Sequence, residues 1–381
     1  MAPRKIQKAV SKLHNGRNPP KQTVSAQKVS ETPAAAPIEL QQALLDVFCR
    51  AFYDGHLQDQ HHHVNATIQV VKGHLFMRDF AKAFAHQEYM DAYALRWSAS
   101  RALGYLDLLL HGDLQPVWLS EINASGPDDN AYDDPLQTTS MSTSTSRPST
   151  GACRVACIGG GAGAEVAASA AATLLSSLSL SQAEIHAIDI ADWSSCVEKL
   201  TAALTQPQIL STHASESAKA ANKPLIDPAR LQVCFSQHDI LNVNESILRE
   251  LLGGVHLCTI MFTLNELFTS SIARTTAFLL ALADTLALGS WLLVVDSPGS
   301  YSEVKLRDND AAKPKRYPMK WLLDHTLLEI AGAGGKSSKW RKHVSDDSRW
   351  FRLSPSLKYP MDLENMRYQI HLYQRIEPEV S

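Results

Sequence analysis

A glycine-rich turn joins an apolar segment to an alanine-rich segment in Arg154-Val-Ala-Cys-Ile-Gly-Gly-Gly-Ala-Gly-Ala-Glu165. Glycines in such a turn let the backbone approach a ligand closely, and the following helix contributes the positive end of its dipole. The spacing Gly159-x-Gly161-x-x-Ala164 also satisfies the dinucleotide-binding fingerprint. A tight strand-to-helix turn without a ligand would use the same glycines, so the turn alone predicts an α/β sheet rather than a particular ligand.

Residues 151–376 alternate short apolar segments with longer helical patterns, which indicates a parallel sheet with helices on its faces. The expected strands are Arg154–Gly159, Glu184–Ile190, Leu231–Asp239, Val255–Phe262 and Trp291–Asp296. The expected helices are Ala164–Leu180, Trp193–Leu204, Asn244–Leu252 and Leu267–Leu288. Two later segments, Trp350–Leu353 and Tyr368–Arg375, are expected to form antiparallel edge strands.

The rest of the chain differs in composition. Residues 1–37 hold seven Lys or Arg and no acid before Glu31, which predicts a disordered basic arm. Residues 38–136 carry helical spacing and predict a helical N-terminal region, whereas residues 137–150 have the composition of a low-complexity linker. No apolar stretch approaches the roughly 20 residues that span a bilayer, so no membrane partner is expected. Six scattered cysteines without a CxxC pair favour free thiols.

Two acids follow the next two expected strands. Asp189 ends the second strand, where a carboxylate can accept both hydroxyls of a ribose whose other end lies over the glycine turn. Asp239 ends the third strand and could accept an adenine amino group, with Ile240 beside the ring. Each acid taken singly could be an ordinary polar strand end or helix cap. Three such features on successive strand ends predict a ligand site there.

Gly159, Gly161, Gly163, Asp189 and Asp239, with Thr263-Leu-Asn-Glu266 after the fourth strand, resemble the class I S-adenosylmethionine-dependent methyltransferases. The resemblance covers about 220 residues, from Arg154 to Arg375. It implies a Rossmann-like class I methyltransferase sheet, here with an N-terminal helical extension, and S-adenosyl-L-methionine as the cofactor. One position departs from the pattern. Where that superfamily carries an acid two residues before the first glycine, this chain has Cys157.

A narrower resemblance covers about residues 40–376. It rests on Tyr93-Ala-Leu-Arg-Trp-Ser-Ala-Ser-Arg-Ala-Leu-Gly-Tyr105, on the turn Ile158–Glu165, and on Trp350-Phe-Arg-Leu with Glu364-Asn-Met-Arg-Tyr-Gln. These segments are similar to the fungal large-subunit ribosomal RNA uridine-N3 methyltransferases. The resemblance implies a nucleolar or nuclear enzyme, with the cytoplasm left open, whose partner is ribosomal RNA or the pre-ribosome. It leaves the oligomeric state open.

Basic residues offer candidate RNA contacts. Lys336, Lys339, Arg341 and Lys342 surround Trp340, a pattern that suits phosphate binding and base stacking if the aromatic is exposed. A solvated loop with a half-buried tryptophan is the competing interpretation. Arg96 and Arg101 flank Trp97 and could bind the cofactor carboxylate or a phosphate, although pairing with Asp91 and Asp107 explains them as well.

Asn265 and Glu266 follow the fourth strand, where class I enzymes commonly place groups that contact the substrate. Methylation at uracil N3 requires loss of a weakly acidic proton, so Asn265 is predicted to orient the base and Glu266 to accept the proton. Capping of the next helix is the competing interpretation.

Two other classes of protein stay open at this point. A nicotinamide-dependent oxidoreductase would use the same glycine turn, and a non-catalytic RNA-binding assembly protein could retain a relic cofactor fold. The histidine run His61-His-His63 has no neighbouring acid or cysteine at a known metal-site spacing, so no metal is expected.

Deletion of residues 1–37 is expected to leave cofactor affinity and thermal stability nearly unchanged, because so polar a segment adds little to a core. RNA affinity should fall. The slope of log affinity against log salt concentration should become shallower by roughly two to three units, because each phosphate bound on single-stranded RNA contributes about 0.7 to that slope and a flexible arm engages only some of its basic residues. RNA binding of full-length and truncated protein at several salt concentrations measures this. Identical slopes would leave the arm with a targeting role only.

Overall fold

The computed structural model describes residues 36–53, 60–124, 152–175, 180–299, 301–304, 315–330 and 338–378, all within one unit of the chain, residues 34–381. The expected linker at 137–150, and the expected basic arm apart from its last two residues, lie outside the described residues.

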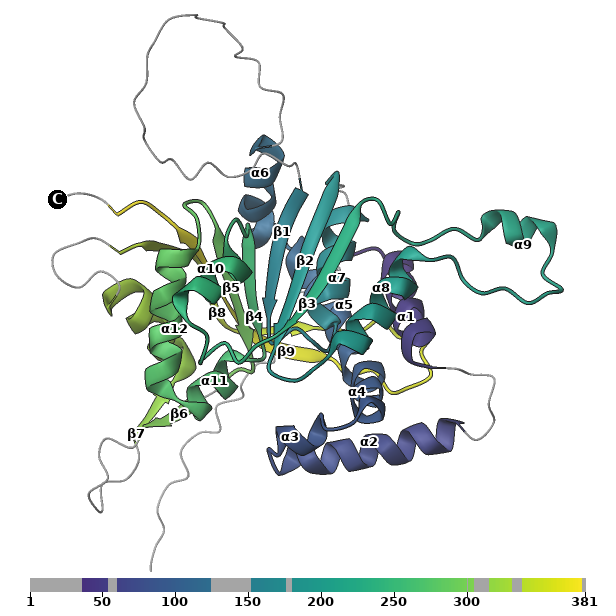
Figure 1. Ribbon diagram of the computed structural model, residues 1–381, viewed down its shortest axis with the longest axis horizontal. Coiled ribbons are helices and arrows are strands. Elements are labelled where there is room, and N and C mark those ends of the chain that lie inside the picture. The colour runs from purple at the N-terminus through teal and green to yellow at the C-terminus, as the bar shows by residue number, and fades with distance from the viewer. Residues whose placement is uncertain are drawn as a thin grey trace, which may run out of the picture. The chain divides into compact units, whose positions relative to one another are not determined.

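A seven-stranded sheet with the order β3-β2-β1-β4-β5-β9-β8 organises the fold (Figure 1). Its strands are β1 Ala152–Ile158, β2 Gln182–Asp189, β3 Leu231–Gln237, β4 Leu257–Met261, β5 Trp291–Asp296, β8 Trp340–Phe351 and β9 Met366–Arg375. The first five are parallel, while β9 is antiparallel to both β5 and β8. A separate hairpin pairs β6 Tyr301–Val304 with β7 Lys315–Pro318. The carboxyl ends of β1 to β5 therefore share one edge, which we call the carboxyl edge.

Helices precede and connect the strands. Before the sheet lie α1 Ile38–Phe52, α2 Gln60–Phe76, α3 Phe80–Ala83, α4 Gln87–Tyr93, the π-helical turn Ala94–Ser98, α5 Ala99–Leu110, the 3-10 turn Gly112–Leu114 and α6 Gln115–Ala124. Between and after the strands lie α7 Ala164–Leu174, α8 Ser194–Thr205, α9 Glu216–Ala221, α10 Glu245–Leu252, α11 Leu264–Ser270, α12 Ile272–Thr285, α13 Met319–Asp324 and the π-helical turn His325–Glu329.

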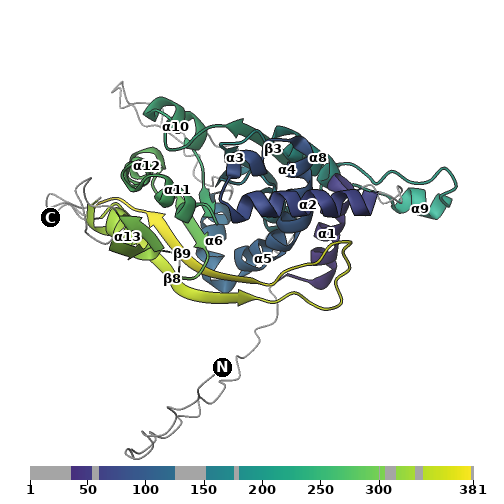
Figure 2. The same ribbon diagram turned by 90° about the horizontal axis from the view of Figure 1, so that it is seen from below.

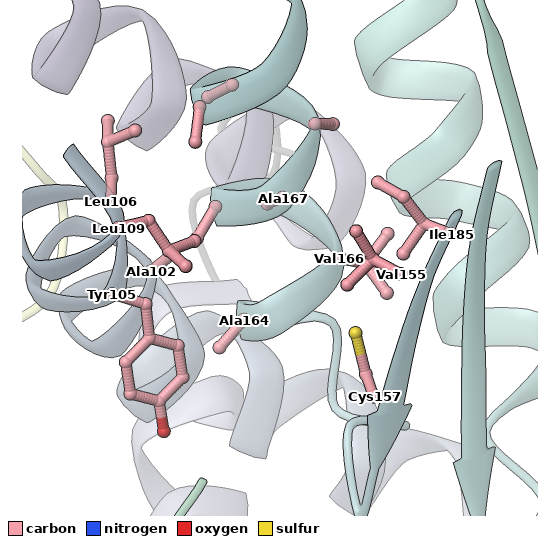
Figure 3. Packing of buried hydrophobic residues seen from close by; sticks show 14 of the residues in the cluster. Ala102, Tyr105, Leu106, Leu109, Val155, Cys157, Ala164, Val166, Ala167 and Ile185 are labelled. Atoms are coloured by element: carbon pink, nitrogen blue, oxygen red, sulfur yellow. The ribbon is translucent and has the colours of Figure 1, made fainter. Parts of the chain in front are cut away.

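Helices cover both faces of the sheet because its central strands, such as β4 and β5, are apolar and buried throughout. One core joins the sheet to α1, α5, α7 and α8, and a second core joins the other face to α10, α11, α12 and α13. Every residue of α7 is buried, and its alanines let α5 approach closely. Figure 3 shows Ala102, Tyr105 and Leu109 of α5 facing α7, with Val155 of β1 on its other side.

The helical extension also reaches the carboxyl edge. Seen from below in Figure 2, α2 to α4 lie in front of the strand ends. Phe84, which follows α3, packs on Trp193 with ring centroids 4.9 Å apart, and Arg78 after α2 forms an ion pair with Glu266 of α11. The sequence predicted α2 to α4 only as part of a helical region. In the structure they cover the carboxyl edge, where the ligand site was predicted.

The five expected parallel strands are confirmed, each within two residues at either end. The expected helix Leu267–Leu288 is wrong: Ser271, with extended backbone, ends α11 and caps α12 by accepting the Arg274 N–H. The late antiparallel pair is confirmed, but only β8 is an edge strand, because β9 lies between β5 and β8. β8 also begins ten residues earlier than expected, at Trp340.

Gly104 on α5 marks the closest approach of this helix to the β8–β9 hairpin. A Cβ there would lie 2.5 Å from Met366 Cε and 3.3 Å from Phe351 Cδ1. We expect Gly104→Val to lower the free energy of unfolding by about 1–3 kcal/mol through overpacking, measured by urea unfolding. Gly73→Ala is the control, since nothing lies within 4 Å of that Cβ. Equal stability of Gly104→Val and wild type would contradict this packing.

Candidate active site

The glycine turn is shaped by its neighbours as well as by its own conformation. Gly159 and Gly163 have φ values of 76° and 83°, which favour glycine. Gly161 has an ordinary φ, but a Cβ there would collide with the Trp193 ring, and a Cβ on Gly159 would collide with Thr263. Gly161 is therefore required by its protein neighbours, whether or not a ligand lies over the turn.

Asp189 holds this turn in place. Its Oδ2 accepts the Gly161 N–H at 3.1 Å, and its Oδ1 accepts the Ala191 N–H at 3.2 Å. Burial raises the pKa of this carboxyl, while the backbone N–H groups and the Trp193 side chain oppose that shift by hydrogen bonding. Asp189 thus lies at the end of β2 with its carboxylate directed at the glycine turn.

Asp239 and Ile240 lie on the adjacent strand end, because the His238 N–H donates to the Asp189 carbonyl at 2.8 Å. Asp239 Oδ1 accepts the Leu241 N–H at 3.1 Å, and Oδ2 accepts the Asn242 amide, so the carboxylate also organises its own loop. Ile240 is buried. The structure brings the predicted cofactor residues together, and an adenine contact by Asp239 stays a prediction.

The junction of β1 and β4 is the switch point of the sheet, since the chain proceeds outward in opposite directions from these two strands. Phe262, directly after β4, has a φ of 56°, a strained conformation for a residue with a side chain. The Arg101 guanidinium lies 5.0 Å from the Phe262 ring centroid and donates to the Tyr93 hydroxyl at 3.1 Å. Burial lowers the pKa of Arg101, but nearby Tyr93, Tyr105 and Asp296 raise it more.

Asn265 and Asp296 meet at the ends of β4 and β5. The Asn265 backbone N–H donates to Asp296 Oδ2 at 3.0 Å, and the Ser297 N–H donates to Oδ1 at 2.7 Å. Burial raises the pKa of Asp296, which is 3% exposed, to about 6. The Asn265 side-chain Oδ1 is buried and has no hydrogen-bond partner in the described part of the chain. An amide oxygen without a partner among the described residues, on a residue whose backbone is bonded to a buried carboxyl, is suited to bind a substrate N–H.

The Glu266 side chain does not cap α11. Its carboxylate pairs with Arg78, and the cap residue of α11 is Thr263, which makes no side-chain capping bond. Neither Asn265 nor Glu266 caps α11 through its side chain, so that competing interpretation is wrong.

Glu165 is a buried acid beside Cys157. It lies in the first turn of α7, is 3% exposed, and accepts a hydrogen bond from the Thr259 hydroxyl. Thr259 is the register partner of Cys157 in the adjacent strand, and Figure 3 shows Cys157 next to the start of α7. Burial raises the pKa of Glu165 to about 8. Glu165, on α7, thus lies near Cys157, the β1 position at which the superfamily carries an acid.

Sequence reasoning missed both buried acids. Asp296 ends β5, so the rule that selected Asp189 and Asp239 could have found it. Glu165 has no comparable local signal, because its burial depends on how α5 and β4 pack around α7.

Arg96 and Arg101 lie in different surroundings. Arg101 lies against Phe262, directly after β4, as described above. Arg96 instead pairs with Glu364 at 2.5 Å, before β9. Asp91, one of the acids considered as their partner, binds Lys199 instead. Only Arg101 is placed to act at the carboxyl edge.

The basic cluster around Trp340 is not where the sequence suggested. Trp340 is 2% exposed and starts β8, opposite Arg375 at the amino end of the sheet. Lys339 pairs with Asp284, and Lys342 pairs with Asp324 at 2.7 Å. An exposed stacking tryptophan here is therefore wrong, because this ring packs in the core and two of its lysines are neutralised. Arg341 is exposed at the same end, and Lys336 lies outside the described residues.

No helix among the described residues is long and apolar enough to cross a membrane. Within the same residues, no three His, Cys, Asp or Glu side chains gather as metal ligands, and His63 contacts Glu88. Two surface hollows lie away from the glycine turn, one lined by Arg96 and Trp97 and one beneath α8.

A parallel 3-2-1-4-5 sheet extended by an antiparallel hairpin, with a glycine turn after its first strand and an acid after its second, defines a class I S-adenosylmethionine-dependent methyltransferase. The chain belongs to the family described as putative SAM-dependent methyltransferase, whose model matches residues 48–374. Membership decides against the nicotinamide-dependent oxidoreductase, and the cofactor is S-adenosylmethionine.

A relative from Saccharomyces cerevisiae (strain ATCC 204508 / S288c), a 25S rRNA (uridine(2843)-N(3))-methyltransferase, is 30% identical over 353 residues, 87% of this chain and 85% of that protein. Among solved structures, a SAM-dependent methyltransferase from Methanosarcina mazei matches with a TM-score of 0.32 and 8% identity, over 58% of this chain and 92% of its own. An O-methyltransferase family protein from Burkholderia thailandensis matches with a TM-score of 0.33 and 14% identity, over 77% of this chain and 62% of its own.

The buried Glu165 predicts a pH-dependent stability. The fold favours its protonated form, so its contribution to stability is complete below the ordinary pKa of 4.5 and is lost as pH rises toward about 8. Between pH 6.5 and 8, the free energy of unfolding of wild type should fall by up to about 2 kcal/mol more than that of Glu165→Gln. Urea unfolding at both pH values measures the difference. Glu250→Gln, at an exposed glutamate, controls for the charge. Parallel pH dependence of Glu165→Gln and wild type would contradict this assignment.

Proposed function

We propose that this methyltransferase transfers a methyl group to N3 of a uridine in large-subunit ribosomal RNA. The observation that carries the proposal is the 30% identity, over 87% of the chain, to a yeast 25S rRNA uridine-N3 methyltransferase. The proposed partner is ribosomal RNA, free or in the pre-ribosome, and the proposed location is the nucleolus. The geometry of the carboxyl edge supports this function in two separate parts.

The first part is the fit of the cofactor. S-adenosylmethionine supplies an activated methyl group when it is bound. Asp189 is fixed at the end of β2 by the Gly161 and Ala191 N–H groups, at the position where an acid can accept ribose hydroxyls. Glu165 lies beside Cys157, and an ammonium group bound there would favour ionisation of this buried carboxyl. Arg101 offers a cation suited to a carboxylate.

The second part is recognition of the uracil edge. Uracil N3 carries a proton between two carbonyl groups, and the Asn265 side chain presents an amide to such an edge. We assign Asp296 as the acceptor of the N3 proton, which leaves the nitrogen an electron pair for bond formation. Glu266 stays the alternative acceptor, although its carboxylate is held in an ion pair with Arg78. The target uridine must be unpaired or flipped out, since pairing hides N3.

The proposal is tested with the full chain, methyl-labelled S-adenosylmethionine and large-subunit ribosomal RNA from cells that lack this protein. Digestion to nucleosides should show the label in 3-methyluridine. Label in another nucleoside would overturn the substrate assignment. Binding of S-adenosylhomocysteine and RNA without any methyl transfer would favour the non-catalytic assembly protein instead.

Asp296 predicts the pH dependence of methyl transfer. The acceptor must be ionised, so the single-turnover rate of wild type should rise with pH through about 6 and then flatten. Asp296→Asn should lower the rate by about 10²–10⁴-fold and lose this rise, while S-adenosylhomocysteine affinity stays nearly unchanged. Glu266→Gln is the matched control and should keep the rise. Loss of the rise in Glu266→Gln alone would transfer the role to Glu266.

A further inference from the structure

Trp350 is a large aromatic residue at the surface of the β8–β9 hairpin, with half of its area exposed. The Arg352 guanidinium lies 4.0 Å from its ring centroid, and the Arg367 guanidinium lies 5.6 Å from it. Both arginines are exposed. An accessible indole between two cations combines the elements that bind single-stranded nucleic acid, a ring on which a base can stack and charges for the backbone.

The register of the hairpin explains why these side chains share one face. Trp350 pairs with Arg367 across the strands, so both point to the same side of the sheet. Arg352 follows Trp350 by two residues and keeps its direction. Phe351 points to the opposite face and is buried in the core that includes α5. We call Trp350, Arg352 and Arg367 the Trp350 platform.

The platform keeps its positive charge. Arg349, on the same strand, is paired with Asp113 at 2.6 Å and with Asp346 at 3.0 Å. By contrast, neither Arg352 nor Arg367 forms an ion pair with a carboxylate among the residues that the structure describes. Among the described side chains, Arg367 donates to the Ser348 hydroxyl, at 3.0 Å. Two unpaired guanidinium groups are available for phosphates.

The platform lies next to the proposed active site. Gln369 pairs with Asp296 at the end of β5 and donates its amide to the Ser297 carbonyl at 2.8 Å. Arg367 precedes Gln369 by two residues on the same face, about 7 Å along the strand toward the carboxyl side. Lys339 and Trp340 lie at the other end of β8, about 35 Å away along a strand of this length.

We propose that the Trp350 platform binds unpaired nucleotides that flank the target uridine, by stacking a base on the indole and holding phosphates with Arg352 and Arg367. This inference rests on the proposed function, because it names where the RNA of that reaction docks. The chemistry requires an unpaired strand, since only a base freed from its duplex exposes a face for stacking.

The test measures the affinity of the full chain for a fluorescently labelled single-stranded RNA that contains the target region, by anisotropy at several salt concentrations. Trp350→Ala should weaken binding by about tenfold or more, and Trp350→Phe should recover most of that affinity. Combined Arg352→Ala and Arg367→Ala should make the salt slope shallower by about 1.4 units if each arginine holds one phosphate, since each phosphate bound contributes about 0.7.

Two exposed residues provide matched controls. Trp321 is 45% exposed and stacks on Tyr317 and His325, and Arg341 is exposed on β8 at the amino end of the sheet. Trp321→Ala and Arg341→Ala should bind RNA within about twofold of wild type. All variants should keep the S-adenosylhomocysteine affinity of wild type, because none of these side chains lies at the glycine turn; this affinity also shows that each variant is folded.

Equal RNA affinity of Trp350→Ala and Trp321→Ala would overturn the platform. Normal binding of free RNA by Trp350→Ala, with loss of binding to pre-ribosomal particles alone, would also overturn it and would indicate a protein partner. The proposed function fails separately: a wild-type protein whose RNA binding depends on Trp350 but which forms no 3-methyluridine would refute the reaction and keep the platform.

Discussion

The hydrogen bond from Gly161 to Asp189 is the contact on which the carboxyl edge depends. It draws the turn after β1 against the end of β2, so closely that the Trp193 ring leaves no room for a Cβ on Gly161. The same turn aims α7 into the sheet, and Glu165 in the first turn of α7 becomes buried beside Cys157. The hydrogen bond between the Gly161 N–H and the Asp189 carboxylate thus joins the end of β2 to the turn that leads into α7 and Glu165.

The parallel part of the fold was predictable because its physics is local. Strands such as β5 are apolar throughout, since helices cover both faces, and the glycines after β1 are required by left-handed backbone at Gly159 and Gly163. β8 was mostly missed for the opposite reason. It is an edge strand whose sequence from Arg341 to Arg349 is largely polar, so its hydrophobic pattern is weak.

The misjudged parts of the site depend on contacts between distant segments. Trp340 looked like the centre of a basic loop, but pairing with β9 buries it at the amino end of the sheet. Nothing in the sequence indicated that Glu266 is paired, whereas in the structure Arg78 of the helical extension forms an ion pair with it. The burial that raises the pKa of Asp296 likewise comes from packing that the local sequence does not show. The positions of residues at strand ends could be predicted from the sequence. Their exposure and their ion pairs could not, because these depend on contacts between distant segments.

We propose that the cofactor lies on the glycine turn, with acids supplied by β2 and by α7. A crystal structure of the full chain with S-adenosylhomocysteine tests this most directly. We expect the ribose hydroxyls against the Asp189 carboxylate and the amino group on the side of Glu165. An adenosyl group bound elsewhere, or an amino group held by other residues with Glu165 still closed on Thr259, would contradict it.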